Sequence, residues 1–599
     1  MNRTRLSTLC LGMLLLVTAP ALLRAESDTK STKPTSVSWG HIEISGSYPE
    51  GALPPGLFGE IQEGLSDGLA RLERAADDKD LRGVILRING PSIGWAKLNE
   101  FRAAIGRVRE KGKKVYAWLD GGSSMDYLLA TACDQVVMPE SGALMFLGLR
   151  AEVSFYKNLF DKLDVKPDML RVGEFKSAAE PYNRTEMSPE FREEMEAILD
   201  DYYRQMVEIV AKSRKLDEEA VRKAMDAGPL TAREAHKLGL LDRIAYQDEL
   251  EELIKKESDG SELKITRRYG RKKVDTDFSG FAGMMKMMNL LMGVEEPRRR
   301  STRTKIAVIH ASGAIMTGES KSDLFGNSTL GSETLIKAIR KAREDDKVKA
   351  IVLRVDSPGG SALASDLIWR ELELVDKPFI ASMGDVAASG GYYISMGADR
   401  IFAEPGTLTG SIGVVGGKLA LGGLFEKVGI TTSVISRGKN SGVMSTTTGF
   451  TDSERAAMVK LLHEVYDQFV SKAAAGRKME KDELEKLARG RVYTGTMAVE
   501  KKLVDELGTL DDAVAAAKKA AGIAADEKVE LLVLPKAVSP FEALFGSLDA
   551  DARLKTGILQ SLFAGIPAEL REPLEGLSTL TQLSREARLV VLPFQLRVR

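Results

Sequence analysis

Apolar residues follow two alternating spacings along the chain, one typical of buried strands and the other of amphipathic helices. The runs "KAIVLRV" at 349–355 and "PFIASM" at 378–383 are short and mostly apolar, as expected of strands buried on both faces. Between them, "SALASDLIWRELELV" at 361–375 has apolar residues at helical spacing. A strand, a helix and a second strand in succession predict a parallel sheet covered by helices, and therefore an α/β fold.

The same pattern occurs twice. Four segments of the first half recur in the second half, in the same order and about 265 residues later. The recurring pairs are "GVILRINGPS" at 83–92 with "AIVLRVDSPGG" at 350–360, "ACDQVVMPESG" at 132–142 with "GADRIFAEPGT" at 397–407, residues 160–176 with 425–441, and residues 230–244 with 493–507. Such an ordered series indicates two divergent copies of one domain.

These repeats predict how the chain is divided. We expect a signal peptide or membrane anchor at 1–25, a linker at 26–39, a first repeat at 40–260, a second linker at 261–303, a second repeat at 304–525 and a C-terminal extension at 526–599. For the Met-rich middle of the second linker, a packed linker helix is favoured over a membrane-touching segment.

The N-terminus indicates export from the cytoplasm. Arg3 and Arg5 precede the apolar run "LSTLCLGMLLLVTAPALL", and "LRA" at 23–25 ends in a small residue suited to cleavage. The run is also about long enough to cross a bilayer, so cleavage and anchoring both stay open. In either case we expect the rest of the chain at the periplasmic face of the inner membrane or free in the periplasm.

Composition narrows the function classes. The 599 residues carry 85 Lys and Arg against 86 Asp and Glu, and this balance gives no basic surface for nucleic acid. The two cysteines, Cys10 and Cys133, make no disulfide framework. The four histidines form no HExxH pair, which argues against a zinc hydrolase. We expect neither a metal nor any other cofactor.

The stretch "GDVAASGGYYIS" holds the candidate nucleophile, Ser389, where a strand ends and a helix begins. Gly390 follows directly, and Gly359 belongs to a second glycine pair at another strand-to-helix loop. Loops at the same end of adjacent parallel strands converge. Their backbone amides would then suit a developing oxyanion. Tight turns would explain each glycine pair singly, but together with a serine they favour catalysis.

No histidine lies between His310 and His463, so a lysine is the plausible base for Ser389. An amine is protonated at neutral pH unless burial or nearby positive charge lowers its pKa. Serine–lysine pairs are an established variant of the catalytic triad. Spacing along the chain does not decide which lysine serves.

The motifs "AASGGYYIS", "DSPGG", "TLTGSIG" and "RVGEFKSAAEPYNRTEMS" occur together here and resemble the signal peptide peptidase A family, in its long, duplicated bacterial form. The resemblance covers nearly the whole chain. It implies two tandem domains of the Clp protease/crotonase-like fold. It also implies a membrane-associated serine protease that assembles as a homotetramer.

Carried over residue by residue, the resemblance makes Ser389 the nucleophile and Lys176, in "GEFKSAAEPY", the general base. Ser411, in "TLTGSIG", matches a serine that orients the lysine, and the amides of Gly359 and Gly390 match the oxyanion hole. Lys439 is the alternative base, since short relatives place their lysine in that segment.

The repeats support a site shared between the two copies. Ser124 is the first-half counterpart of Ser389, but Met125 and Asp126 follow it in place of glycines. Asp126 would place negative charge beside a forming oxyanion. Conversely, Lys176 corresponds to Ser441 in the second copy. One copy has kept the serine and the other the lysine, which predicts an active site at their interface.

The resulting prediction is a Ser-Lys endopeptidase that degrades cleaved signal peptides and other unfolded apolar polypeptides. Two other classes stay open. A crotonase-type acyl-CoA enzyme would use the same fold, but export would remove it from the CoA pool and it would not need Lys176. A non-catalytic scaffold that binds peptides or membranes would tolerate replacement of Ser389.

Overall fold

The computed structural model describes residues 36–51, 63–258, 261–271, 280–281, 283–285, 288, 303–322, 328–536 and 589–591. The predicted signal peptide or anchor at 1–25 and most of both linkers and of the C-terminal extension lie outside these residues. The limits predicted for these segments therefore stay predictions. Within the described ranges, no helix combines the length and the apolar character that crossing a membrane requires.

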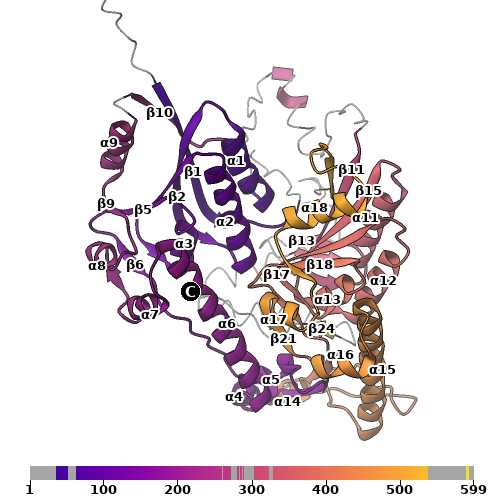
Figure 1. Cartoon of the computed structure of the whole chain (residues 1–599). Helices are drawn as coiled ribbons and strands as arrows, with labels where there is room; N and C mark the ends of the chain where they lie inside the picture. Colours follow the sequence, from indigo (N-terminus) through magenta and orange to yellow (C-terminus); the bar gives the residue numbers. More distant parts are fainter. Residues whose placement is uncertain are drawn as a thin grey trace, which may run out of the picture.

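The first repeat is built on a six-stranded parallel sheet (Figure 1). Its strand order is β10-β1-β2-β3-β5-β9. The strands are β1 (Ser36–Ser47), β2 (Leu81–Ser92), β3 (Lys114–Leu119), β5 (Gln135–Met138), β9 (Arg243–Ile244) and β10 (Glu262–Thr266). A small second sheet contains β4 (Gly122–Ser123), β6 (Ala143–Met145) and β8 (Leu230–Thr231).

Helices cover this sheet and extend the first repeat toward the second repeat. They are α1 (Leu65–Asp77), α2 (Trp95–Glu110), α3 (Ser124–Ala130), α4 (Lys157–Leu163), η1 (Ser177–Ala179), α5 (Glu180–Asn183), α6 (Pro189–Arg214), α7 (Glu218–Asp226), α8 (Ala232–Lys237) and α9 (Gln247–Glu257). The side chain of Ser188 caps α6 by accepting the Phe191 N–H, and the helix ends at Lys215 with φ 55°.

The second repeat has the same sheet order, β23-β11-β15-β17-β18-β22, with β19 and β21 added along the end of β17. Its strands are β11 (Lys305–Ser312), β15 (Val348–Ser357), β17 (Phe379–Ala388), β18 (Arg400–Ala403), β19 (Leu408–Gly410), β21 (Val492–Thr494), β22 (Glu506–Leu507) and β23 (Glu530–Leu534). The matching order confirms the duplicated α/β fold with parallel sheets.

Helices also cover the sheet of the second repeat. They are α11 (Ser332–Glu344), α12 (Ala362–Leu372), α13 (Gly390–Ser395), α14 (Gly422–Lys427), α15 (Asp452–Arg477), α16 (Lys481–Leu487), α17 (Gly495–Glu500) and α18 (Leu510–Ala520). Helix α15 has 26 residues, as α6 has, and a capping box of Thr451 and Glu454 fixes its start.

Each repeat reaches further along the chain than its predicted end. β10 pairs with β1 in the first sheet, although the sequence predicts a linker at residues 262–266. β23 likewise pairs with β11, although the sequence predicts residues 530–534 to belong to the C-terminal extension. Both are short edge strands, and a short strand that pairs only at a sheet edge gives a weak periodic signal.

A third sheet joins parts of the chain that lie far apart in sequence. Its order is β13-β14-β12-β16-β24-β20-β7. The strands are β7 (Lys166–Val172) of the first repeat, β12 (Ala314–Met316), β13 (Lys321–Ser322), β14 (Ser328–Gly331), β16 (Gly359–Ser361) and β20 (Val414–Ala420) of the second repeat, and β24 (Leu589–Val591) near the C-terminus. Pairing of β7 with β20 therefore brings the loop after β7 to the second repeat.

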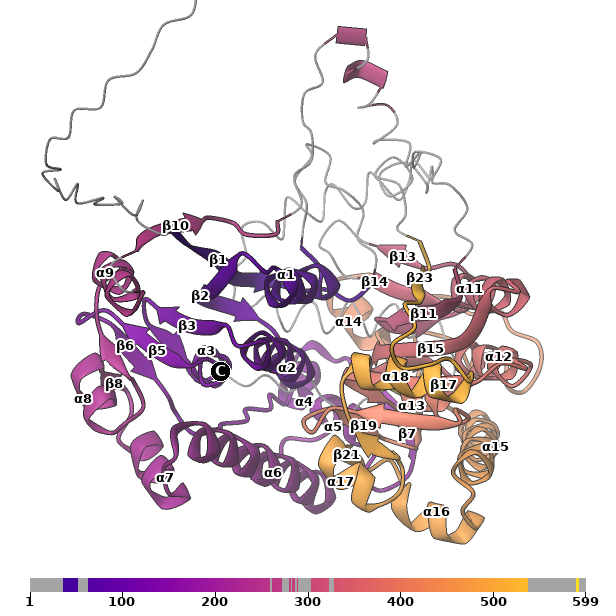
Figure 2. The same ribbon diagram turned by 45° about the horizontal axis from the view of Figure 1, so that its top comes forward.

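The hydrophobic core of the first repeat continues across the junction between the repeats. Besides its own strands and helices, the core includes Ala388, Leu408 and Val492 of the second repeat. The two repeats lie side by side, and α6 runs from the first repeat to β21 of the second (Figure 2). The strand that leads into Ser389 thus packs directly against the other repeat.

Candidate active site

Ser389 lies between the end of β17 and the start of α13, in a conformation that serine rarely adopts. Its φ is 57° and its ψ is −111°. Its N–H donates to the carbonyl of Gly410 at 2.7 Å, and its own carbonyl accepts the Tyr393 N–H at 2.8 Å. A positive φ in a non-glycine residue costs about 1–3 kcal/mol and persists where the surroundings impose it. Such strain is typical of functional sites.

The Lys176 side chain reaches Ser389 from the other repeat. Lys176 lies in the loop between β7 and η1 and is fully buried. Its Nζ lies 2.8 Å from Ser389 Oγ, 2.9 Å from Ser411 Oγ and 2.9 Å from the Ser411 carbonyl oxygen. An uncharged amine has two N–H groups and one lone pair. This arrangement lets it donate twice to Ser411 and accept the Ser389 proton.

Burial is the main influence on the charge of Lys176. It lowers the pKa of Lys176 well below the ordinary lysine value, and the carboxyl of Glu194 opposes this in part. Removal from water disfavours the ammonium form because the uncharged oxygens around Nζ replace its hydration only in part. The free amine is therefore present at a pH where an exposed lysine is protonated.

Ser411 is held as firmly as Ser389. It follows β19 with φ 52°, and its N–H donates to the carbonyl of Arg491 at 2.7 Å. Gly490, beside Arg491, packs so closely on Lys176 that an added Cβ would lie 2.5 Å from the Lys176 backbone nitrogen. Residues 490–492 therefore connect the lysine loop of the first repeat to the Ser411 loop of the second.

The two glycine loops converge beside Ser389, as the sequence predicted. A Cβ at Gly390 would lie 3.0 Å from Gly359 Cα and 2.7 Å from Ser365 Oγ. Gly390 opens α13, and the first amides of a helix have no partner within the helix. The Gly359 N–H, in contrast, donates to Ser357 Oγ at 3.2 Å in this structure.

The counterparts of these residues form no second site. Ser124 is the first residue of α3, and its Oγ bonds to backbone atoms of Met145 and Leu147. Asp126 serves the cap of the same helix by accepting from Ser123. Ser441 is exposed, and so is Lys439, the alternative base. Lys176 is therefore the lysine that the fold brings to Ser389.

A half-buried charge cluster holds the two repeats together close to Ser389. Lys97 Nζ lies 2.7 Å from Asp385 and 2.9 Å from Asp356. Asp385 also accepts the Ala96 N–H at 2.9 Å, so this second-repeat carboxylate caps α2 of the first repeat. Since Asp385 lies four residues before Ser389 on β17, this cluster fixes the strand against the other repeat.

Two of these contributions had no signal in the sequence. Glu194 is buried beside the site, but in α6 it is one of many acidic residues on a largely polar helix. Gly490 follows Arg489 in a loop without any recognisable motif. Both act across the junction of the repeats, and the spacing within one repeat does not encode such contacts.

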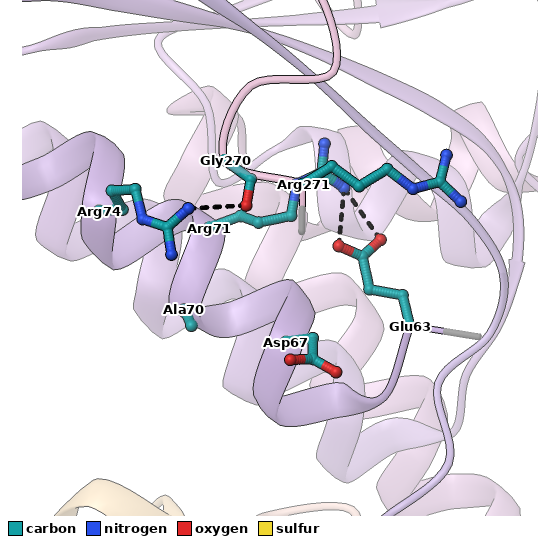
Figure 3. A pocket seen from close by; sticks show the side chains of 7 residues that line it. All are labelled: Glu63, Asp67, Ala70, Arg71, Arg74, Gly270 and Arg271. Atoms are coloured by element: carbon teal, nitrogen blue, oxygen red, sulfur yellow. Dashed lines mark hydrogen bonds and ion pairs between the residues drawn. The ribbon is translucent and has the colours of Figure 1, made fainter. Parts of the chain in front are cut away.

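A separate surface pocket lies in the first repeat, where the segment after β10 crosses α1 (Figure 3). Arg71 forms an ion pair with Glu63 at 2.9 Å, and Arg74 donates to the carbonyl of Gly270 at 2.8 Å. These bonds tie the end of the repeat to its first helix. None of the residues that line this pocket contributes to the arrangement around Ser389.

Comparison with known proteins identifies the family. The profile of "Peptidase family S49" matches residues 107–260 and 372–524, once in each repeat. "Serine protease SPPA, chloroplastic" from Arabidopsis thaliana is 35% identical over 77% of this chain and 66% of its own length. "Protease 4" from Salmonella typhi is 32% identical over 79% of this chain and 75% of its own.

Among solved structures, a ClpP1 mutant from Listeria monocytogenes matches 35% of this chain and 94% of its own, with 14% identity and a TM-score of 0.24, which is too low to bear on the fold. Membership of a peptidase family favours the peptidase over the two alternatives, an acyl-CoA enzyme and a non-catalytic scaffold. The chain belongs to peptidase family S49, carries the family domain twice and is a serine peptidase.

Proposed function

We propose that this serine peptidase uses Ser389 as nucleophile and Lys176 as general base, in one site formed by both repeats. The observation that carries the proposal is the 2.8 Å separation of Lys176 Nζ and Ser389 Oγ across the junction. Burial of the amine supports it, because a base must be uncharged to accept a proton. Ser411, with two contacts of 2.9 Å to Nζ, orients the amine.

The proposed reaction proceeds in two halves. Lys176 takes the Ser389 proton while Oγ bonds to the peptide carbonyl carbon. The tetrahedral intermediate collapses, the C–N bond breaks, and the leaving amine takes the proton from Lys176. A water molecule then gives its proton to Lys176 and attacks the ester. Release of the acid returns the proton to Ser389.

We assign the oxyanion to the amides of Gly359 and Gly390. Their close approach supports this pairing, since a shared oxygen needs both donors within about 3 Å. The Gly359 N–H would exchange its 3.2 Å bond to Ser357 Oγ for the oxyanion. That bond is longer than a strong hydrogen bond, so the exchange costs little.

For the substrate, we propose unfolded apolar polypeptides, with cleaved signal peptides among them. Support comes from the third sheet, where β24 already lies as an antiparallel strand against Gly359–Ser361 of β16 and next to β20. An extended polypeptide therefore fits beside the proposed oxyanion site. Recognition through backbone hydrogen bonds suits a peptidase that accepts many sequences.

The test of the nucleophile is covalent labelling. Incubation of the full chain with a fluorophosphonate should modify Ser389, and mass spectrometry of the digested protein identifies the labelled residue. The Lys176→Ala variant should label far more slowly because Ser389 then has no base. Modification of another serine at the same rate would contradict the proposal.

We also propose that the chain assembles as a homotetramer at the periplasmic face of the inner membrane. Support for assembly comes from helix α12, whose Leu363 and Leu367 are 54% and 45% exposed. Their first-repeat counterparts on α2, Ala96 and Glu100, are buried against the second repeat. A further copy's first repeat would cover α12 in the same way.

The proposed assembly can be tested by substituting the two exposed leucines of α12 and measuring the number of chains per particle. Light scattering after gel filtration should give about four chains per particle for the wild type. We expect the double variant Leu363→Asp, Leu367→Asp to be a monomer, because two charges would be buried in an apolar contact. Leu238→Asp, at an exposed leucine of the first repeat, is the control. A monomeric wild type, or an unchanged double variant, would refute this surface.

A further inference from the structure

The carboxyl group of Glu194 is buried at the junction of the repeats and only half satisfied. Glu194 lies on α6 of the first repeat and is 1% exposed. Its Oε2 accepts the N–H of Val492 at 2.7 Å. Its Oε1 is buried and has no hydrogen-bond partner within the described ranges. Over the same residues, Glu194 forms no ion pair. A buried carboxyl without a second partner needs an explanation.

Glu194 is bonded to the part of the chain that holds both proposed catalytic residues. Val492 lies opposite Gly410 in the β19–β21 pair, and Gly410 accepts the Ser389 N–H. The neighbouring Arg491 accepts the N–H of Ser411, which in turn contacts Lys176 Nζ. The carboxyl of Glu194 is thus connected by two short backbone routes to the Ser389–Lys176 pair.

The charged and titratable groups that face Glu194 come from several elements. They are Lys176 before η1, Glu180 on α5, and Arg491 and Tyr493 at β21. Arg491 is paired with Glu193 at 2.7 Å, and Glu180 with Arg171 at 2.6 Å. The Tyr493 hydroxyl donates to the carbonyl of Leu487. Of the two basic residues that face Glu194, Arg491 is paired with a carboxylate, whereas Lys176 Nζ contacts only uncharged oxygens.

We propose that Glu194 and Lys176 titrate as one pair, so that Glu194 is a positioning residue that controls whether Lys176 is a free amine. This inference rests on the proposed role of Lys176 as base. When the pair holds one proton, that proton is on the carboxyl, which leaves the amine free, or on the amine, which leaves a carboxylate. Only the first form can accept the Ser389 proton.

Burial supports the existence of the active form. It raises the pKa of Glu194 well above the usual range, against the opposing effects of Val492, Arg491 and Lys176. It lowers the pKa of Lys176, against the opposing effect of Glu194. Each charge is disfavoured alone, but the two opposite charges attract each other in a medium of low dielectric constant. A Glu194 carboxylate therefore favours the inactive ammonium form.

Glu194→Gln separates this role from a structural one. The glutamine amide oxygen can still accept the Val492 N–H, but the side chain cannot ionise. With the carboxylate form removed, Lys176 should become a free amine at lower pH. We expect the acid limb of kcat/KM to move down by about one pH unit, which is about tenfold more activity on that limb. The plateau at higher pH should stay within about twofold.

The experiment measures kcat/KM on a fluorogenic apolar peptide, and the rate of fluorophosphonate labelling of Ser389, as functions of pH. Labelling needs no peptide binding, so it excludes effects of substrate ionisation. Glu196→Gln, at an exposed glutamate on the same helix, is the matched control and should leave both profiles in place. If Glu194→Gln does not fold, Glu194→Met replaces it, since it is uncharged and of similar volume.

The outcomes are distinguishable. An acid limb that moves down in both assays supports the paired titration. An unmoved limb in a folded Glu194→Gln protein refutes it and leaves Glu194 as an anchor for Val492 alone. If Lys176→Ala retains the wild-type rate, the proposed base itself is wrong. If Lys176→Ala is inactive while Glu194→Gln keeps the wild-type profile, only the present inference fails.

Discussion

Replacement of Lys176 by alanine is expected to lower kcat/KM by about 10⁴-fold, and replacement of Ser389 by at least as much. Ser389 Oγ has the Lys176 amine 2.8 Å away, and Lys176→Ala leaves the hydroxyl without a base. The double variant should be no slower than Ser389→Ala, because two groups that act in one step do not contribute additively. Steady-state hydrolysis of a fluorogenic apolar peptide measures all three.

Two controls make this result specific. Lys439→Ala should retain activity within about twofold, since Lys439 is exposed in the loop before α15. Lys176→Arg should be as inactive as Lys176→Ala, because a guanidinium stays protonated and cannot accept a proton. Thermal denaturation checks that the variants fold. An active Lys176→Ala together with an inactive Lys439→Ala would place the base within the second repeat and overturn the shared site.

The direction of the lysine pKa also fixes the pH dependence of the wild-type rate. Because burial lowers the pKa of Lys176, the amine is free at a pH where an exposed lysine is still protonated. Activity should therefore persist below the pH range in which an exposed lysine becomes protonated. It should be lost only as the pH falls through the lowered pKa of Lys176. The acid limb should disappear from the residual rate of Lys176→Ala, since the titrating group is then gone.

Gly390→Ala is expected to lower kcat by about 10²–10³-fold with little change in KM. The added Cβ would lie 2.7 Å from Ser365 Oγ, 3.0 Å from Gly359 Cα and 3.1 Å from the Gly360 nitrogen. Two of these three neighbours are backbone atoms that cannot rotate away. The loops must then separate, and the two proposed oxyanion donors no longer converge on one oxygen.

Gly106→Ala is the matched control for this substitution. Gly106 lies within α2, and a Cβ there would meet no atom within 4 Å. Alanine in a helix interior is more stable than glycine by roughly 0.5–1 kcal/mol, so this variant should keep full activity and unfold at a slightly higher temperature. A folded Gly390→Ala protein with unchanged kcat would show that the approach of the two loops is unimportant for the rate.

Much of this protein can be predicted from its residues alone, because local spacing determines local structure. Residues 350–355 are buried on both faces, so the mostly apolar composition of the run at 349–355 is sufficient to predict strand β15. The repeated segments by themselves predict two α/β domains. The glycines beside Ser389 and their absence beside Ser124 likewise distinguished the two repeats, since a backbone amide can approach an oxyanion only where no side chain intervenes.

Contacts between the repeats required the tertiary structure. Pairing of β7 with β20 brings Lys176 to Ser389, which lies 213 residues away in sequence. The same junction buries Glu194 against Val492 and lets Asp385 cap a helix of the other repeat. Periodicity records which face of an element is buried, but not which atoms bury it. The protonation state of the lysine depends on those atoms, and therefore on how the two copies pack.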